Sequence, residues 1–458
     1  MILPIWQIDI WLFIMKLIKN KLNCFSLNLR KMVKKKLIRV TTADISLNSL
    51  LRGQLNYLNQ YYEVVGVAKD TGVLNEVAAR EGIRVIDAPL ERPISIGKDI
   101  KALWFLWRLF RHEKPWCVHA NTPKGSLLAM VAAWAARVPN RIYTVTGLRY
   151  QATTGMLRTI LKTMERVTCC CANQVIPEGE GVKRALREDK ITGKQLQVVH
   201  HGNINGKDTS YLSREATSEL LRAENKGTRL MADATPFDGR RYMRQKLGYT
   251  DHDFVFILIA RMVRDKGINE LAEVMRRLVG HAADLPRQPK LLIVGEKEVQ
   301  SGGHITPEAQ RFLSDSAAVF YAGLQKDVRP YLMAADALVF PSYREGFPNV
   351  PMEAGAMELP CIVTNINGCN EIIIDGENGV IIPAPVDRHG HLIQFAPDDP
   401  QADGFSSPMT KALYQSMCDL INNADNTNRM AAYSRRLIQE RYEQRDVWEA
   451  LRQRYAEL

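Results

Sequence analysis

Residues 337–356 read ALVFPSYREGFPNVPMEAGA, an apolar run followed by a loop and then by a helix signal. The run Ala337–Phe340 is apolar throughout, which is typical of a parallel strand covered on both faces. Pro351 suits the first turn of a helix, and Asn349 stands just ahead of it. Free N–H groups at such a helix start bind anions, above all phosphate. The stretch therefore predicts a buried strand, an anion-binding loop and a helix.

A second junction of the same kind lies upstream. The run Phe254–Ala260 predicts another buried strand, and Arg261 and Lys266 follow it. Ligands in open α/β sheets lie beyond the carboxyl ends of the strands, so both loops should face one crevice. Two cations there could neutralise a diphosphate. A lone Glu, Arg or Lys beside a turn is usually solvated surface, but two matched junctions favour a ligand site.

Short apolar strands alternate with helical patterns along the rest of the chain, which indicates parallel sheets in two doubly wound α/β domains. We expect strands at 36–41, 63–68, 83–87, 115–120, 141–146, 172–177, 196–200, 254–260, 290–294, 318–322, 336–340, 360–364 and 379–382. We expect helices in the first half near 48–60, 71–81, 98–113, 124–137, 155–170 and 179–188. Apolar residues at helical spacing near the end, such as Val447, Leu451 and Tyr455, predict a last helix that docks onto the body.

The stretch 203–250, which carries Gly206, Gly227, Pro236 and Gly239, breaks this alternation and marks the link between the domains. The predicted organisation is an apolar and basic extension at 1–32, a first domain at 33–205, a linker region at 206–250, a second domain at 251–435 and C-terminal helices at 436–458.

The net charge of +11 does not indicate a nucleic-acid partner. Residues 1–40 hold nine Lys or Arg and one Asp, so they account for eight of these charges and leave the body nearly balanced. Two interpretations of the extension stay open. It is an interfacial membrane anchor, or the biological start is Met32, just before the first strand signal.

The sequence indicates neither a metal site nor a disulfide framework. The eight cysteines include no C-x-x-C spacing, and the three adjacent ones at Cys169–Cys171 make no sensible disulfide framework. We expect no metal and no other cofactor.

The sequence resembles the retaining glycosyltransferases of family 4, whose architecture is GT-B, two Rossmann-like domains facing a central cleft. Arg344–Ala354 is similar to the E-x7-E region of that family. Other stretches agree in order and spacing: Arg261…Lys266-Gly267, Leu292–Glu296, Ala335–Ser342 and Asn367–Glu371. In the first half, Thr41–Leu51, His119–Gly125 and His201–Gly206 resemble the branch that builds bacterial capsules and surface polysaccharides. The resemblance covers roughly residues 33–458 and leaves out the extension.

The resemblance implies donor-side roles for matched positions. Arg261 and Lys266 would hold the diphosphate of a UDP-sugar, and Glu345 would contact the transferred hexose near its reacting carbon. The backbone N–H groups of Phe347, Asn349 and Val350 would bind sugar and phosphate, and Glu353 would accept hydrogen bonds from the ribose. Such enzymes retain the anomeric configuration and generally need no metal, because cations can stabilise the departing diphosphate.

On the acceptor side the sequence departs from the family. Many relatives carry His-x-His-Thr where this chain has His119-Ala-Asn121-Thr122, and some carry His where it has Thr146. His119 and Asn121 are the candidate catalytic residues here, although His119 equally fits a buried core position. Lys124, Thr146 and Arg149 are candidate contacts for a polyprenyl-diphosphate saccharide, with solvated surface as the alternative.

The implied enzyme is cytoplasmic and works at the inner face of the cell membrane. Residues 98–116 form a basic, aromatic-rich helix that either meets the membrane surface or packs its rings on the sheet. Two other functions stay open: a UDP-sugar epimerase of the same fold, and a non-catalytic basic scaffold or nucleic-acid-binding protein. The epimerase would need acid and base groups facing the sugar from both domains.

Overall fold

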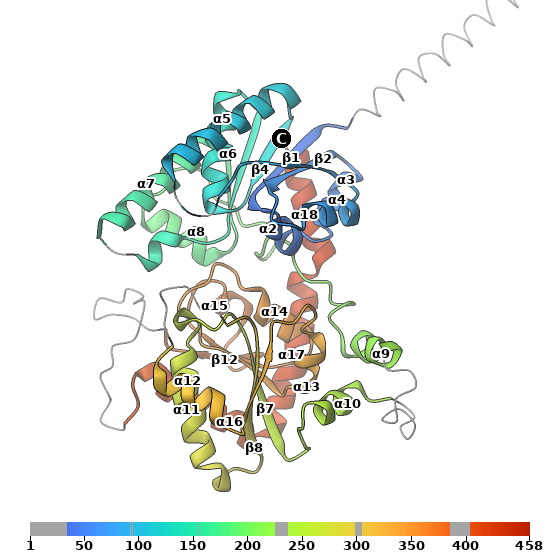
Figure 1. The fold of residues 1–458 in the computed structure, drawn as a ribbon, viewed down its shortest axis with the longest axis vertical. Helices are drawn as coiled ribbons and strands as arrows, with labels where there is room; N and C mark the ends of the chain where they lie inside the picture. Colours follow the sequence, from blue (N-terminus) through green and yellow to red (C-terminus); the bar gives the residue numbers. More distant parts are fainter. Residues whose placement is uncertain are drawn as a thin grey trace, which may run out of the picture.

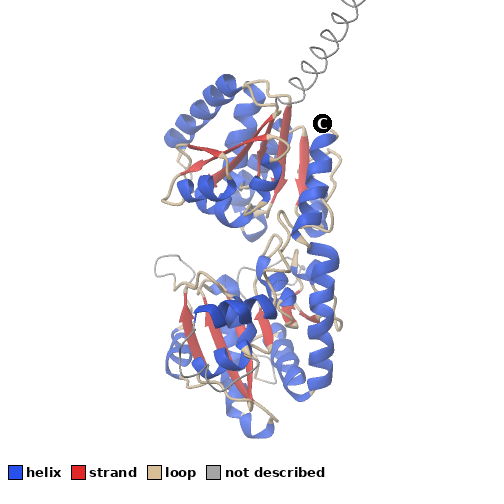
Figure 2. Cartoon of the chain, turned by 90° about the vertical axis from the view of Figure 1, so that its right-hand side faces the viewer, coloured by secondary structure: helices blue, strands red, loops and turns tan. Residues whose placement is uncertain are grey.

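The computed structural model describes residues 34–458 except 92, 94, 154, 225–236, 298–304 and 385–403. The predicted extension at 1–32 lies outside the described residues. Two six-stranded parallel sheets form the cores of two lobes, which lie one above the other in Figures 1 and 2. This confirms the predicted class of two doubly wound α/β domains.

The first sheet has the strand order β3-β2-β1-β4-β5-β6. Its strands are β1 (Lys36–Ala43), β2 (Glu63–Lys69), β3 (Arg84–Asp87), β4 (Cys117–Ala120), β5 (Asn140–Val145) and β6 (Gln174–Pro177). Its helices are α2 (Asp44–Leu50), α3 (Gln54–Asn59), α4 (Leu74–Glu81), α5 (Ile96–Glu113), α6 (Pro123–Ala135), α7 (Gly155–Cys171) and α8 (Glu180–Glu188), with a 3-10 turn η1 (Arg149–Ala152).

The second sheet has the order β12-β11-β10-β7-β8-β9, which repeats the topology of the first. Its strands are β7 (Asp253–Ile259), β8 (Gln288–Val294), β9 (Val319–Gly323), β10 (Ala337–Phe340), β11 (Cys361–Thr364) and β12 (Gly379–Ile382). Its helices are α9 (Arg214–Glu224), α10 (Gly239–Lys246), α11 (Ile268–Gly280), α12 (Pro307–Asp315), α13 (Arg329–Ala334), α14 (Asn349–Ala356), α15 (Cys369–Ile372) and α16 (Pro408–Asn422), with 3-10 turns η3 (Arg264–Lys266) and η4 (Ala282–Asp284).

Two of the expected elements differ in the structure. The predicted strand at 196–200 is wrong, because only Leu196 makes a bridge, to Val175, before the backbone turns at His200 (φ 53°). The predicted helix at 48–60 is two helices, α2 and α3, separated at Gly53, whose φ is 78°. A Cβ on Gly53 would lie 2.7 Å from the ring of Trp448, so the close approach of the C-terminal helix requires glycine here.

The stretch between the two sheets is partly helical. Its helices α9 and α10 pack against each other and against α13, and therefore extend the second lobe. Arg240 of α10 pairs with Asp336 at 2.8 Å, directly ahead of β10.

The last two helices, α17 (Ala424–Tyr442) and α18 (Gln444–Ala456), connect the lobes, as the long red helical segment of Figure 1 shows. Helix α17 packs on α14 of the second lobe, whereas α18 packs on α3 of the first. Val447, Leu451 and Tyr455 are buried, which confirms the predicted docking of the last helix. The chain thus crosses between lobes twice, and the crossings are hydrogen-bonded: Lys207 N donates to Tyr442 O at 2.7 Å, and Gln444 N donates to Lys207 O at 2.9 Å.

A buried carboxyl group in the first lobe makes its stability depend on pH. Glu165 of α7 accepts a 2.5 Å hydrogen bond from the Tyr143 hydroxyl of β5, and burial raises the pKa of Glu165 from 4.5 to about 7. Above pH 4.5 the unfolded chain loses this proton while the folded chain keeps it, so the free energy of unfolding falls as pH rises and levels off above pH 7.

We predict that this loss amounts to about 3 kcal/mol between pH 4.5 and 7, and that Glu165→Gln removes it. The amide keeps an oxygen that can accept from Tyr143 but carries no proton to lose in this range. Denaturant unfolding at a series of pH values checks the prediction. Equal pH dependence in the wild-type and Glu165→Gln proteins would contradict it.

Candidate active site

The loops that follow β7 and β10 lie against each other at the carboxyl edge of the second sheet. A Cβ on Gly267 would collide with the Pro341 carbonyl, so this approach depends on glycine at a φ of 70°. It brings Lys266 Nζ to 2.5 Å from Glu345 Oε1, and the Ser342 hydroxyl donates to the same oxygen at 2.8 Å. Both members of the ion pair are largely buried, with 17% and 16% of their side-chain surface exposed.

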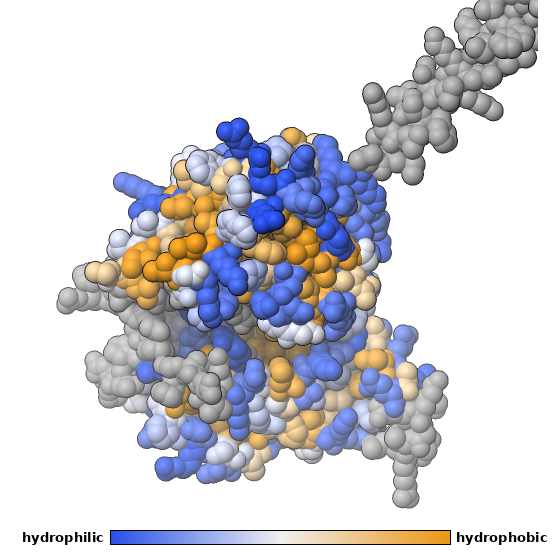
Figure 3. All heavy atoms as spheres, turned by 45° about the horizontal axis from the view of Figure 1, so that its top comes forward, coloured by the Kyte–Doolittle hydropathy of each residue, from blue (hydrophilic) through white to orange (hydrophobic). Residues whose placement is uncertain are grey.

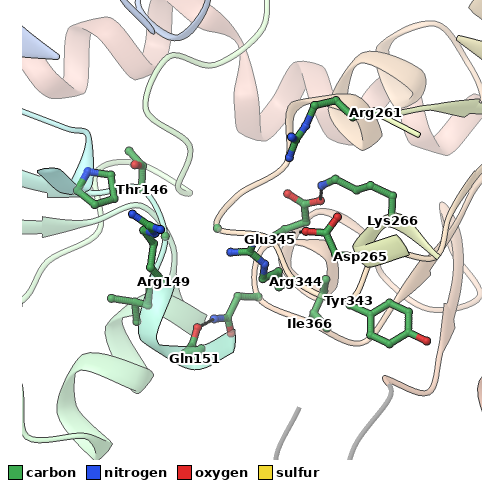
Figure 4. Close-up of a pocket in the computed structure, with 15 residues that line it drawn as sticks. Thr146, Arg149, Gln151, Arg261, Asp265, Lys266, Tyr343, Arg344, Glu345 and Ile366 are labelled. Carbon is green, nitrogen blue, oxygen red and sulfur yellow. Dashed lines mark hydrogen bonds and ion pairs between the residues drawn. The ribbon is translucent and has the colours of Figure 1, made fainter. Parts of the chain in front are cut away.

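This ion pair borders a cavity of about 290 Å³ between the lobes. The second lobe contributes Arg261, Asp265, Lys266, Tyr343, Arg344, Glu345, Gly346, Ile366 and Asn367, and the first contributes Pro123, Thr146, Gly147, Leu148, Arg149 and Gln151. Figure 4 shows the charged ends of Arg149, Arg261 and Arg344 directed into the space between the lobes.

The charges around the cavity favour an anionic ligand. Four cationic side chains and two carboxylates line it, and Arg344 lies 3.3 Å from the carboxylate of Asp265. The excess of two positive charges suits a diphosphate, which loses its hydration on entering a partly enclosed site. Among the described residues no cluster of three or more His, Cys, Asp or Glu is placed to hold a metal ion.

The remaining candidate donor residues are not among the residues that line this cavity. Phe347 is buried and packs on Tyr442, with 5.7 Å between ring centroids. Asn349, the first residue of α14, accepts from the Asn203 amide at 3.3 Å. Val350 is the next residue of α14, and Glu353 one turn on pairs with Lys207 of the chain crossing at 2.6 Å.

On the first lobe, the structure separates the predicted residues into two groups. Thr146 and Arg149 line the cavity. His119 does not: it is 1% exposed, with Nδ1 at 2.5 Å from the Tyr455 hydroxyl and Nε2 at 2.7 Å from the Thr144 hydroxyl. Burial lowers the pKa of His119 well below its ordinary value, so the ring stays neutral.

Asn121 and Lys124 are likewise held by internal contacts. Asn121 is fully buried; its side-chain oxygen lies 3.5 Å from Arg39, and its carbonyl accepts from the Thr146 hydroxyl at 2.7 Å. Lys124 pairs with Asp99 of α5 at 2.6 Å. These contacts position the wall of the cavity from behind and do not place the side chains in it.

Several lining residues escaped the sequence analysis. Asp265 and Arg344 belong to the motifs around Lys266 and Glu345. Their position next to these two residues is the signal from which their place on the cavity wall could have been predicted. Gln151 carries no local signal, because its role arises from a contact across the lobes.

Comparison with known proteins assigns the family. The model for glycosyl transferases group 1 matches residues 253–394, and the model for a glycosyl transferase 4-like domain matches residues 56–202. This chain belongs to the family of glycosyltransferases that combines these two domains. The two matches fall on the two lobes that enclose the cavity, so the candidate site of the enzyme lies between its two family domains.

Relatives of the glycosyltransferase span most of its length. It is 27% identical to the capsular polysaccharide biosynthesis glycosyltransferase CapM of Staphylococcus aureus, over 93% of this chain and 97% of CapM. It is 26% identical to an Escherichia coli UDP-Gal:alpha-D-GlcNAc-diphosphoundecaprenol alpha-1,3-galactosyltransferase, over 71% of this chain and 77% of that protein.

Solved structures confirm the GT-B fold. Anabaena HepE in complex with UDP and glucose superposes with a TM-score of 0.68 at 15% identity, and the match covers 93% of this chain and all of that one. A glycosyltransferase from Rickettsia africae gives 0.66 at 16% identity, with 93% and 98% covered.

We predict that Glu345→Ala abolishes sugar transfer by this glycosyltransferase, with activity at least 100-fold below wild type, while the protein still folds. The substitution removes the carboxylate that faces the cavity and leaves the packed elements around it intact. Activity assays together with melting temperatures check this, with Glu377→Gln, an exposed carboxylate of the same lobe, as control. A fully active Glu345→Ala enzyme would remove Glu345 from the catalytic machinery.

Proposed function

We propose that the enzyme transfers a hexose from a UDP-sugar to a polyprenyl-diphosphate-linked saccharide in the synthesis of a capsule, exopolysaccharide or O-antigen. The observation that carries this proposal is the cationic cavity between the two sheets, with Lys266 and Glu345 paired on its wall. The names of the Staphylococcus and Escherichia relatives support the product and acceptor classes, and HepE, a structural neighbour, holds UDP and glucose.

The proposed donor site uses charges from the second lobe. Arg261 and Lys266 stabilise the diphosphate, and Glu345 hydrogen-bonds the hydroxyls of the hexose. Backbone N–H groups at Asn349 and Val350 assist, since the amides in the first turn of α14 have no intrahelical acceptor. Phe347 offers its N–H from the loop just ahead of that helix. Glu353 accepts from the ribose hydroxyls, with Lys207 holding its carboxylate in place.

The proposed reaction retains the anomeric configuration and uses no metal ion. The bond between the anomeric carbon and the diphosphate oxygen breaks, the acceptor hydroxyl bonds to the same face, and its proton leaves with the UDP product. Lining cations supply the charge stabilisation that the departing diphosphate needs. Water must be excluded meanwhile, because hydrolysis would otherwise compete with transfer.

The epimerase alternative finds less support in the site. Acid and base groups would have to face the sugar from both lobes, but the described lining residues of the first lobe include neither a carboxylate nor a histidine. The basic scaffold alternative is set aside by membership in an enzyme family.

We predict that UDP and UDP-sugars raise the melting temperature, whereas GDP and ADP do not, and that Lys266→Ala removes the effect. A ligand at about 100 times its dissociation constant stabilises a protein by about 2.7 kcal/mol, which amounts to a few degrees. A thermal-unfolding panel on both proteins measures this, and the UDP-sugar with the largest shift is then tested for transfer. Equal shifts with all nucleotides would contradict a uridine-specific donor site.

A peripheral position at the inner membrane face completes the proposal. No helix in the described ranges is both long and apolar enough to cross a membrane. The adjacent helices α5, α6 and α7 instead expose nine large apolar side chains: Ile96, Ile100, Trp104, Trp107, Trp134, Met156, Leu157, Ile160 and Val167. Figure 3 shows apolar atoms gathered over the first lobe.

The exposed residues of α5 recur at helical spacing, so they form one stripe beside the buried face that carries Leu106 and Phe110. Lys98, Lys101 and Arg108 are on the same helix, and Arg108 lies over the Trp104 ring. An apolar stripe flanked by cations suits an anionic bilayer surface, where the acceptor lipid is held.

We predict that the protein sediments with vesicles containing anionic lipid, and that the double variant Ile100→Ser, Trp104→Ser loses most of this binding. The variant removes apolar area from the exposed stripe and leaves the core side of α5 unchanged. Leu324→Ser, which removes an exposed leucine on the second lobe, serves as control. A wild-type protein that stays in the supernatant, or an equal loss with Leu324→Ser, would contradict membrane docking through α5.

A further inference from the structure

A carboxylate of the second lobe caps a helix of the first. Glu371 of α15 accepts from the backbone N–H of Glu180 at 2.6 Å through Oε2, and from that of Gly181 at 3.0 Å through Oε1, which also receives the Gly368 N–H at 3.3 Å. Glu180 and Gly181 begin α8, whose own N-cap residue, Gly179, has no side chain to offer. The helix therefore receives its capping group from the other domain, where a negative charge also suits the helix dipole.

The surfaces around this contact leave no room for side chains. A Cβ on Gly179 would lie 2.8 Å from both carboxylate oxygens of Glu371 and from the Phe347 ring. A Cβ on Gly181 would lie 2.6 Å from Asn367 Oδ1. The start of α8 is thus shaped to receive this one segment of the second domain.

The same segment forms part of the cavity wall. Asn367 lines the cavity, and its amide donates to Gln151 Oε1, a lining atom of the first domain, at 3.2 Å. Gly346 abuts the Thr146 carbonyl so closely that a Cβ there would collide with it. The contact of Glu371 with α8 therefore occurs in the arrangement that brings both walls of the cavity together.

A neighbouring carboxyl group, that of Glu178, does not place a second negative charge beside the capping contact. Glu178, directly after β6, is buried, and burial together with the charge of Glu371 raises the pKa of Glu178 well above its ordinary value. Glu178 keeps its proton to higher pH than an exposed glutamate does, which limits repulsion beside the capping contact.

We propose that Glu371 is a positioning residue that latches the two domains in the closed form by capping α8, and so excludes water while the sugar is transferred. The proposal rests on the proposed UDP-sugar transfer. Glu371 touches neither reactant; its carboxylate acts through α8 and the cavity wall. Loss of one charge-assisted contact of this kind shifts a two-state equilibrium about tenfold.

Two variants test the latch from its two sides. Glu371→Gln replaces the carboxylate by an amide whose NH2 group cannot accept a hydrogen bond, and Gly181→Ala places a methyl group against Asn367 without altering the second domain. Glu180→Gln is the matched control, because it removes a charge at the same helix end while keeping the backbone N–H that the latch uses. We measure transfer, UDP affinity, hydrolysis of the UDP-sugar to UDP and free sugar, and the radius of gyration by small-angle scattering.

Both variants should lower kcat for transfer about tenfold, raise the ratio of hydrolysis to transfer, and increase the radius of gyration. UDP affinity should stay within twofold of wild type, and the double variant should be no worse than either single one. Unchanged kcat and radius in both variants would overturn the proposal. So would UDP affinity that falls in parallel with kcat in Glu371→Gln, because Glu371 would then bind the donor itself.

Two further results have defined meanings. If Glu371→Gln does not fold, Gly181→Ala decides the question from the other side of the contact. If the wild-type enzyme transfers no sugar from any UDP-sugar, the proposed function fails, and the radius of gyration alone then decides whether the latch exists.

Discussion

Parallel sheets collect the loops that follow their strands at one edge, and the arrangement of this enzyme depends on two such edges facing each other. The loops after β7 and β10 meet at the switch point of the second sheet and hold Lys266 against Glu345. The opposing edge supplies Thr146, Arg149 and Gln151. Neither edge alone encloses a ligand, so the chemistry requires both sheets at a fixed separation.

The local sequence was sufficient to predict residues of the cavity wall in the second domain. It was insufficient to predict the contacts between the domains. Lys266 and Glu345 could be predicted because each follows a buried apolar run, and the carboxyl ends of parallel strands share one edge. The pairs Lys207–Glu353 and Glu371–Glu180 could not be predicted, since their members lie 146 and 191 residues apart. Neither strand periodicity nor loop composition encodes which surfaces will meet. Such pairings arise only after both domains have folded and docked.

The first domain shows a different limit of sequence reasoning. His119, Asn121 and Lys124 have the chemistry of site residues and stand at or just after the end of a strand, yet each is engaged inside the domain. The partners that engage His119 and Lys124 are Tyr455, brought by the last helix, and Asp99 on α5. A polar residue at a strand end faces the cleft only when no internal group pairs with it, and that depends on distant parts of the chain.

Because the chain crosses between the lobes twice, neither domain can be separated from the other by cutting the chain at one point. The first domain is completed by α18, whose Leu451 and Tyr455 are buried in the core formed by residues from β1, α3 and β2. A fragment that stops before the second domain would expose that core to water. Exchange of first domains between related enzymes therefore needs two junctions, one near Lys207 and one near Glu443, where the crossings pair with each other. Recombination at a single point would leave each hybrid with a last helix shaped for another protein.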